Sequence, residues 1–448
     1  VNLGGWLLLE EWMWPGEMSH KGIHDEWSLI AKYGGPEDPR AQKIMHRHWE
    51  NFLREEHLDQ LARFGITHVR VPVGYWLMGS VYNVSDGFVD GGEVYLRRLM
   101  RWLKQRRMKA VLDLHALPGG QAVDGFTGRR YDQATFFLES AHFERGKRAA
   151  EALADLILDY EAQPSSSGVV VGIELLNEPL HDFWDAPMGI RAFYEEMVPW
   201  VRQKLPAEKY MVLLSFMDSP HTPTADWLAE ARSKDPVSFA GVVYDLHLYH
   251  LFGDNTAPWT PGQDHCKTCC RDPHLIKPMF SKSVPSIIGE YALSTGFAGW
   301  EEDGFARTHL ENQWSLFNTT EAVVGSFQWN FRLLLPDEKL DMYKEWSLLD
   351  LINSGYLPPD GVYGSDLSAR CPQLGDRVGS ECPSFENMTV IWTSRCEWQL
   401  RANASASAPG RTLSAEEAES IVELAVARRS CGLEWFALVA SLLLGVRV

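Results

Sequence analysis

Apolar runs alternate with amphipathic stretches along most of the chain, and one apolar run organises the rest. Residues 169–179 read Val-Val-Val-Gly-Ile-Glu-Leu-Leu-Asn-Glu-Pro. A continuous β-branched run is typical of a strand buried on both faces, as in a parallel barrel. Proline cannot donate to a sheet ladder, so we expect the strand to stop at about Pro179, with Glu178 at its carboxyl end. Burial there would favour the protonated carboxyl that a general acid requires, whereas the alternative is a Glu that caps a helix or pairs with a surface base.

The same alternation predicts further strands and the helices between them. Strands are expected over residues 1–9, 67–73, 109–117, 210–216, 241–249, 284–293 and 322–331. Helices are expected over residues 41–64, 95–108, 149–160, 191–204, 225–232, 307–317 and 346–353. A count of about eight strands, most of them followed by a helix, predicts an α/β protein with a (β/α)8 TIM barrel. Residues 251–282, which hold a Cys cluster, are expected to form an irregular insertion.

The amino-acid composition of the chain changes near residue 357. We therefore expect a barrel domain over residues 1–357 and an extension over residues 358–448, rich in Cys and Ser, with a helix over residues 414–429. The apolar tail over residues 435–446 is too short to span a bilayer. A cleaved lipid-anchor signal, a packed helix and a gene-model error all fit this tail. The chain starts without Met inside a predicted strand, so we interpret its N-terminus as truncated and the absence of a signal peptide as uninformative.

Charge and cysteine usage narrow the class of protein. A formal net charge of -18 argues against nucleic acid or an anionic membrane surface as partner. The 18 Trp offer flat faces on which sugar rings stack, although many of them would simply fill the core. The 7 Cys favour disulfides with one thiol left over, because the Cys266–Cys270 cluster lacks the second pair and the His spacing of a zinc site. Four sequons, at Asn83, Asn318, Asn387 and Asn403, also indicate an extracellular or cell-surface glycoprotein.

Polar side chains gather where the predicted strands end. These residues are Arg70, His115, Asn177, Glu178, His247, Tyr249, Glu290 and Trp329. Two Glu on different strands that face one barrel mouth are the minimal apparatus of glycoside hydrolysis, one protonated and one ionised. An adjacent Arg70 would favour the ionised form of one Glu, and Tyr249 could donate a hydrogen bond to the same carboxylate. The two His fit hydrogen bonds to sugar hydroxyls, and Trp329 fits a stacking floor.

Each of these residues also has a structural interpretation. A strand His is usually a satisfied structural residue, Trp329 could belong to the core, and Arg70 could pair with a buried acid. Asp113 and Glu174 precede the strand tips, so we expect them to be structural. The coincidence of so many polar groups at successive strand ends is what favours a pocket.

Seven motifs carry a resemblance to a known family. They are Val1-Asn2-Leu3-Gly4-Gly5-Trp6-Leu7, Val69-Arg70-Val71-Pro72-Val73-Gly74-Tyr75-Trp76, Asp113-Leu114-His115 with Pro118-Gly119-Gly120-Gln121, Leu176-Asn177-Glu178-Pro179, Asp245-Leu246-His247-Leu248-Tyr249, Gly289-Glu290-Tyr291 and Glu345-Trp346-Ser347-Leu348-Leu349-Asp350. Over residues 1–357 the chain resembles glycoside hydrolase family 5, and more narrowly its fungal-type exo-β-1,3-glucanases.

The resemblance implies a role for each candidate. Glu178 would be the acid/base, Glu290 the nucleophile, and Asn177 a ligand of the sugar 2-hydroxyl. Arg70, His115, His247, Tyr249 and Trp329 match the family's remaining active-site positions. The implied reaction is a double displacement that retains configuration, acts on a β-glucan and requires no metal or organic cofactor.

Departures from the family pattern leave other readings open. The chain has Ala-Leu-Pro-Gly-Gly-Gln after His115 and Asn-Phe-Arg after Trp329, and its Cys-bearing loop is its own. These changes concern the outer subsites, so a β-1,6-glucan, a β-1,4-glucan or a glycolipid remains an alternative substrate. A catalytically dead glycan-binding barrel and a wall protein attached through its tail are alternatives from other classes.

Overall fold

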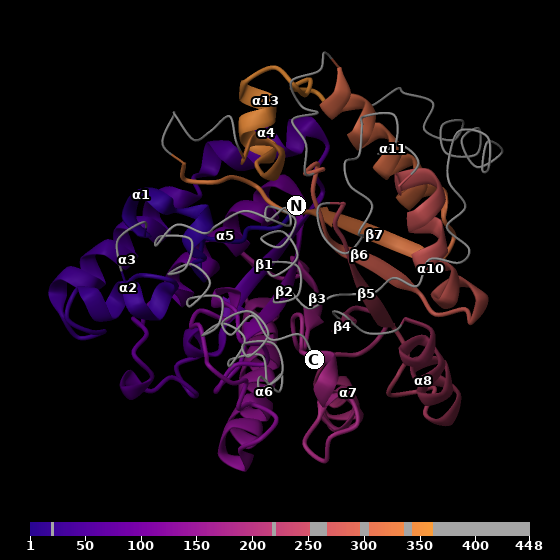
Figure 1. Cartoon of the computed structure of the whole chain (residues 1–448), viewed down its shortest axis with the longest axis horizontal. Coiled ribbons are helices and arrows are strands. Elements are labelled where there is room, and N and C mark those ends of the chain that lie inside the picture. Colours follow the sequence, from indigo (N-terminus) through magenta and orange to yellow (C-terminus); the bar gives the residue numbers. More distant parts are fainter. Residues whose placement is uncertain (19–21, 217–220, 251–266, 296–303, 336–342, 362–448) are drawn as a thin grey trace, which may run out of the picture. The chain divides into compact units, whose positions relative to one another are not determined.

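Seven parallel strands form one sheet whose order in space follows their order in the sequence (Figure 1). The computed structural model describes residues 1–18, 22–216, 221–250, 267–295, 304–335 and 343–361. The strands are β1 (His68–Gly74), β2 (Lys109–Ala116), β3 (Val170–Glu174), β4 (Met211–Ser215), β5 (Val242–Leu248), β6 (Ser286–Tyr291) and β7 (Val323–Gln328). Each strand pairs in parallel with the next one, so all of their carboxyl ends lie at one rim.

The N-terminal segment closes the sheet into a barrel. Asn2 forms a parallel bridge with Arg70 of β1, and its backbone N–H donates to the carbonyl of Gln328 in β7 at 2.9 Å. The strand expected over residues 1–9 is therefore much shorter than predicted, because the chain turns away at Gly4 and at Gly5, whose φ is +73°. With this segment in the eighth position, the fold is the predicted (β/α)8 barrel.

Helices follow most of the strands. They are α1 (Pro15–Met18), α2 (Glu26–Lys32), α3 (Pro39–Phe52), α4 (Glu55–Phe64), α5 (Glu93–Arg106), α6 (Ser140–Ala162), α7 (Ile190–Lys204), α8 (His221–Lys234), α10 (Asp272–Ser281), α11 (Phe305–Thr319) and α13 (Leu348–Asn353). Apart from the one over residues 41–64, the helices predicted within the described residues are present, with shifted ends. The helix predicted over residues 414–429 and the apolar tail lie outside the described residues.

Two predictions about helices are wrong. The single helix expected over residues 41–64 is two helices, because Leu53 and Arg54 are extended and the Arg54 N–H donates to Nδ1 of His57 at the start of α4. The insertion expected to be irregular contains α10, whose Pro273 stands in the first turn, where a missing N–H costs nothing.

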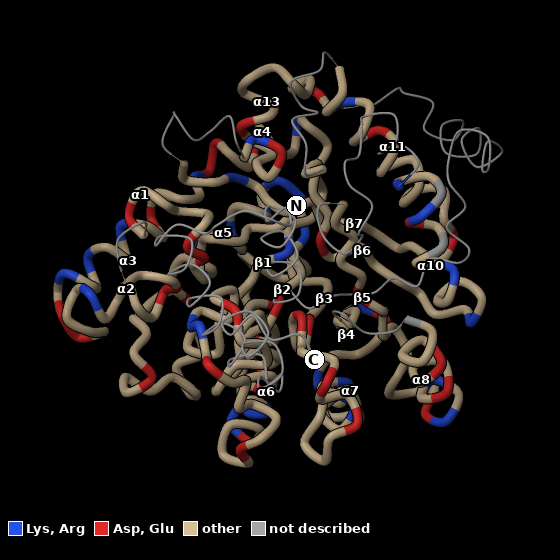
Figure 2. Tube along the Cα trace, viewed as in Figure 1, with Lys and Arg blue, Asp and Glu red and all other residues tan. Residues whose placement is uncertain are grey.

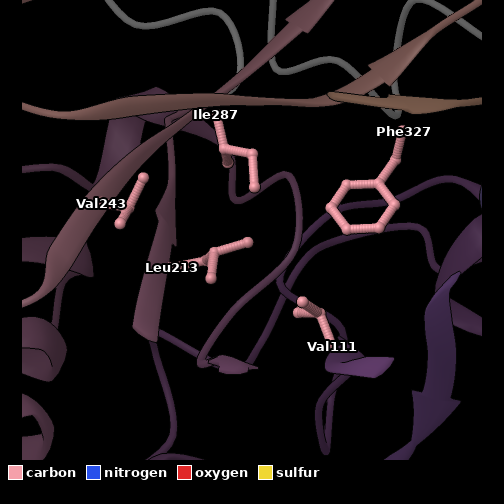
Figure 3. Packing of buried hydrophobic residues seen from close by; sticks show 5 residues of the cluster. All are labelled: Val111, Leu213, Val243, Ile287 and Phe327. Atoms are coloured by element: carbon pink, nitrogen blue, oxygen red, sulfur yellow. The ribbon is translucent and has the colours of Figure 1, made fainter. Parts of the chain in front are cut away.

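The barrel interior is filled in layers. Figure 3 shows an apolar layer whose side chains point toward one another from five strands: Val111, Leu213, Val243, Ile287 and Phe327. Side chains repeat on one face of a strand every two residues, so the next layer toward the carboxyl ends holds Asp113, Ser215 and Asp245. The core therefore changes from apolar to polar within one side-chain repeat below the rim.

The outer helices carry charges of both signs. Figure 2 shows Lys and Arg beside Asp and Glu on α6, α7 and α8. Lys147 of α6 lies 2.8 Å from Glu144 and 2.7 Å from Glu196 of α7, as is typical of a solvated helix face. Among the described helices, none is both long and apolar enough to cross a membrane.

Candidate active site

The structure brings all eight predicted site residues together at the carboxyl-end rim. Arg70, His115, His247 and Glu290 lie within β1, β2, β5 and β6, whereas the others follow β3, β5 and β7 directly: Asn177, Glu178, Tyr249 and Trp329. Strand β3 ends at Glu174, earlier than the predicted stop near Pro179, so Glu178 lies in a loop and adopts φ +40°. A positive φ is uncommon for a Glu, and such backbone conformations concentrate at functional sites.

Arg70 is the hub of the site. Its guanidinium is fully buried and donates to Glu174 Oε2 at 2.7 Å, Asn177 Oδ1 at 2.7 Å, Glu290 Oε1 at 2.9 Å and Asn2 Oδ1 at 3.0 Å. It also lies 3.1 Å from Asp113 Oδ2. Both interpretations of Arg70 therefore hold, because the residue pairs with buried acids and also orients the candidate nucleophile.

Glu290 has the contacts of an ionised carboxylate. Arg70 contacts one oxygen, and the hydroxyl of Tyr249 donates to the other, Oε2, at 2.7 Å. Burial, followed by the charge of Glu290, raises the pKa of Tyr249 well above its ordinary value. The protonated phenol, which can donate to Glu290, is therefore favoured.

Glu178 lies across the mouth from Glu290. Its Oε1 is 2.8 Å from Nδ1 of His247, and its backbone N–H donates to Oγ of Ser215 at 3.2 Å. One carboxylate oxygen of Glu178, one of Glu290 and a ring nitrogen of His247 all lie within 4.8 Å of one another. A short spacing of this kind belongs to glycosidases that retain configuration, whose carboxyl groups are about 5–5.5 Å apart.

His115, Asn177 and Trp329 form one side of the site. His115 Nδ1 is 2.6 Å from Asp113 Oδ2, and its Nε2 is 3.3 Å from Nδ2 of Asn177. The indole of Trp329 stacks on the imidazole with ring centroids 5.7 Å apart and an interplanar angle of 15°. Both His rings contact protein groups, and their hydrogen bonds to sugar hydroxyls stay a prediction.

The buried charges do not balance if every carboxyl is ionised. Arg70 and His247 face five carboxyl groups, those of Asp113, Glu174, Glu178, Asp245 and Glu290. Burial raises the pKa of Glu174 well above its usual value, although Arg70 opposes this. Burial thus favours the protonated form of Glu174, which would lessen the excess of negative charge in the barrel.

Some members of the site were not predicted. Asn2 accepts from Arg70 and donates through Nδ2 to the carbonyls of Gly289 and Phe327 at 2.9 and 3.2 Å. Gln121 donates to the carbonyls of His115 and Asn177 at 2.8 and 3.0 Å, so it fixes two candidates at once. The sequence signal for both was their presence within the Asn-Leu-Gly-Gly-Trp and Pro-Gly-Gly-Gln motifs.

Two groups of described side chains have the spacing of metal ligands. One is Glu178, His247 and Glu290, and the other is Glu174, Asp245 and His247. Oxygens of Glu178 and Glu290 already accept hydrogen bonds, and the groups needed for acid/base and nucleophilic chemistry are the same atoms. Of the predicted Cys cluster, Cys266 lies outside the described residues and Cys269 is disulfide-bonded.

Comparison with known proteins defines the class. The family model "Cellulase (glycosyl hydrolase family 5)" matches residues 34–332, so the chain belongs to glycosyl hydrolase family 5 and is a glycosidase by class. It is 30% identical over 306 residues to "Glucan 1,3-beta-glucosidase" of Blumeria graminis, covering 67% of this chain and 66% of that protein. It is also 30% identical over 294 residues to "Probable glucan 1,3-beta-glucosidase A" of Aspergillus fumigatus, covering 65% and 64%. The match thus spans less than two thirds of the length of these relatives.

Solved structures agree on the fold. The rutinosidase from Aspergillus niger superposes with a TM-score of 0.60 at 19% identity, covering 80% of this chain and 96% of that one. The structure named AoRut gives a TM-score of 0.59 at 20% identity over 80% of this chain. At these identities the likeness shows the barrel fold.

Proposed function

We propose that this protein is a retaining β-glucosidase that removes glucose from the ends of β-1,3-glucans. The observation that carries the proposal is the pair Glu178 and Glu290, buried at one rim with oxygens within 4.8 Å. That spacing leaves no room for a water between nucleophile and sugar, as an inverting reaction would need.

The contacts of the two carboxylates support a different role for each. Glu290, held by Arg70 and Tyr249, attacks the anomeric carbon while Glu178 gives its proton to the departing oxygen. A glycosyl–Glu290 ester results. Water then attacks the same carbon, loses its proton to Glu178 and releases the sugar with its original configuration.

The linkage and the exo mode rest on similarity. Relatives at 30% identity bear the name glucan 1,3-beta-glucosidase, and the matched region holds both Glu and their supporting groups. Trp329, 4% exposed and stacked on His115, provides an apolar plane on which a glucose ring can pack.

The test is the release of glucose from reduced laminarin, with the anomer followed by proton NMR. We expect β-glucose first from the wild type and almost none from Glu178→Gln or Glu290→Gln. Oligosaccharides in place of glucose would make the enzyme endo-acting. Turnover confined to another β-glucan or a glycolipid would reject the β-1,3 linkage, and no turnover on any of them would favour a glycan-binding barrel.

We also infer that the protein is exported and glycosylated. The disulfide at Cys269 supports an oxidising compartment, and the sequon residues Asn83 and Asn318 are exposed. Expression in a eukaryotic secretory host, followed by mass measurement before and after glycosidase treatment, tests this. With a secretory leader supplied in front of Val1, a secreted protein without glycan at either Asn would contradict the inference of glycosylation, and a free thiol at Cys269 in protein isolated from its natural source would contradict the inference of export.

A further inference from the structure

The imidazole of His247 lies between two carboxyl groups. Nδ1 is 2.8 Å from Oε1 of Glu178, and Nε2 is 3.6 Å from Oδ2 of Asp245 on the opposite side of the ring. The side chain of His247 is 6% exposed and that of Asp245 is fully buried. The ring is therefore placed to carry a proton on each nitrogen, one directed at each carboxyl group.

Asp245 is held in place from behind. Its Oδ1 accepts from the backbone N–H of Gly289 at 2.7 Å, whereas Oδ2 and the Nε2 of His247 have no hydrogen-bond partner and face each other. A side chain at position 289 would overlap the Asp245 carboxylate, so the glycine is what allows this approach. Asp245 thus has one oxygen fixed by the backbone of β6 and one free to hold a charged imidazole.

Other charged and titratable groups around the ring also favour an imidazole that is protonated on both nitrogens. Glu290 Oε2 of β6 is 3.5 Å from Nδ1, and Glu174 of β3 has an atom within 4.8 Å of those of Asp245 and His247. Arg70 contacts both Glu174 and Glu290, and the hydroxyl of Tyr249 donates to Glu290. Among the described residues, the ion-pair partners of the imidazole are the acids Glu178, Asp245 and Glu290.

We propose that His247 and Glu178 share one proton in the free enzyme, and that Asp245 is the positioning residue that keeps this proton in the active site. The inference rests on the proposed glycosidase function. Under this proposal His247 is part of the acid/base group, and its role is not limited to binding sugar hydroxyls.

The proton count closes over one turnover. The pair starts with the shared proton, which passes from Glu178 to the glycosidic oxygen as the bond between that oxygen and the anomeric carbon breaks and Glu290 bonds to the carbon. In the second step the attacking water gives a proton to Glu178 as its oxygen bonds to the carbon and the ester to Glu290 breaks. The pair then again holds one proton, and neither step transfers a proton to or from Asp245.

The electrostatics agree with this geometry. Burial lowers the pKa of His247, but Glu290, Asp245 and Glu178 together raise it well above its ordinary value. Removing the negative charge of Asp245 would weaken the hold of the pair on its proton.

The perturbation is Asp245→Asn, compared on two substrates. The Asn carbonyl can still accept from Gly289, so the fold should persist, and a thermal melt checks this. On laminaribiose, whose leaving group needs a proton, we expect kcat/KM to fall about 100-fold, and on 2,4-dinitrophenyl β-glucoside, whose leaving group needs none, less than about 3-fold. The basic limb of kcat/KM on laminaribiose should move to lower pH.

The matched control is Asp113→Asn. Asp113 is as buried as Asp245 and lies 2.6 Å from the imidazole of His115, the other His of the site. It contacts Arg70, whereas Asp245 contacts His247. Its loss should reduce kcat/KM alike on the two substrates. An equal loss on both substrates for Asp245→Asn, with an unmoved basic limb, would overturn the proposal.

A second measurement tests the protonation state of His247 directly and needs no substrate. In the protein labelled with ¹⁵N-histidine, both ring nitrogens of His247, assigned with His247→Gln, should stay protonated at pH 8. In Asp245→Asn, the pH at which the His247 ring loses a proton should be at least about one unit lower than in the wild type. A His247 that is neutral at pH 7 in the wild type would overturn the proposal. Absence of glycosidase activity in the wild type would reject the proposed function instead.

Discussion

Replacing Arg70 with lysine is the perturbation that tests the site most directly. The guanidinium reaches five side chains in different directions: Asn2, Asp113, Glu174, Asn177 and Glu290. A lysine keeps the positive charge but presents all of its donors from one nitrogen at the end of a flexible stem. Arg70→Lys therefore separates the geometry of the site from its net charge.

The magnitude follows from the contacts that cannot be rebuilt. Lysine can satisfy two or three of the partners, so at least two hydrogen bonds to buried polar or charged groups are lost. Each such bond contributes about 1.5–3 kcal/mol, which makes the variant about 3–6 kcal/mol less stable. A loss of this size lowers Tm by about 10 °C in a domain larger than 250 residues. If Glu290 loses its partner, kcat/KM falls by about 10²–10³.

The assays are thermal unfolding and kcat/KM on an aryl β-glucoside as a function of pH. Arg106→Lys is the matched control, because Arg106 also makes a forked contact, to Asp59 at 2.8 and 3.0 Å, and a third contact to Glu55 at 3.0 Å. Both of those acids are about half exposed, so the control should change the free energy of unfolding by less than about 1 kcal/mol. If Arg70→Lys behaved like this control in both assays, the buried network could not be what holds Glu290.

Three further predictions concern positions behind the site. Gly289→Ala would drive a methyl group into the Asp245 carboxylate, so a loss of about 1–3 kcal/mol in the free energy of unfolding is expected by urea denaturation, and an unchanged midpoint would contradict it. Gly4→Ala would place its Cβ 2.5 Å from the ring of the buried Trp329, so the ring must shift: KM for the glucoside should rise and Tm should fall, and an unaltered KM would show that the indole does not contact the sugar. Burial raises the pKa of Glu26 to about 8, so between about pH 4.5 and 8 the unfolded chain binds fewer protons than the folded one and stability falls as pH rises through that window. Glu26→Gln should abolish this decline, on the order of a few kcal/mol, in melts from pH 5 to 9, and a parallel decline in both proteins would refute it.

The barrel and most of its rim were predictable because they depend on local patterns. Apolar β-branched runs fix strands such as β3, and parallel strands must deliver their carboxyl-end residues to one rim, so Glu178 and Glu290 had to meet there. Roles of individual groups were harder to predict, because they depend on contacts between residues far apart in the sequence. The link from His247 to Asp245 involves residues two positions apart, yet its meaning comes from Glu178, 69 positions away.

Other features depended on tertiary contacts that have no local signature. The amphipathic pattern continues across Leu53 and Arg54, so the break between α3 and α4 is not visible in it. The first strand reads as a full strand, but its pairing is limited to a bridge at Asn2 because the glycines that follow turn the chain away. Sequence patterns report burial well and report the length of pairing poorly.

The closure of the barrel by Asn2 has a consequence for when, during folding, the enzyme becomes active. Its side-chain amide joins carbonyls 287 and 325 positions away, and the same side chain accepts from Arg70. Contacts of such high contact order form late, and β7 is the last of the described strands to leave the ribosome. Until then the N-terminal segment, which pairs with β1 on one side, has an unpaired edge on the other, and Arg70 lacks its contact to Glu290 of β6, so nascent chains are candidates for chaperone binding. Activity should accordingly appear in a single late step, when the two ends of the sheet meet.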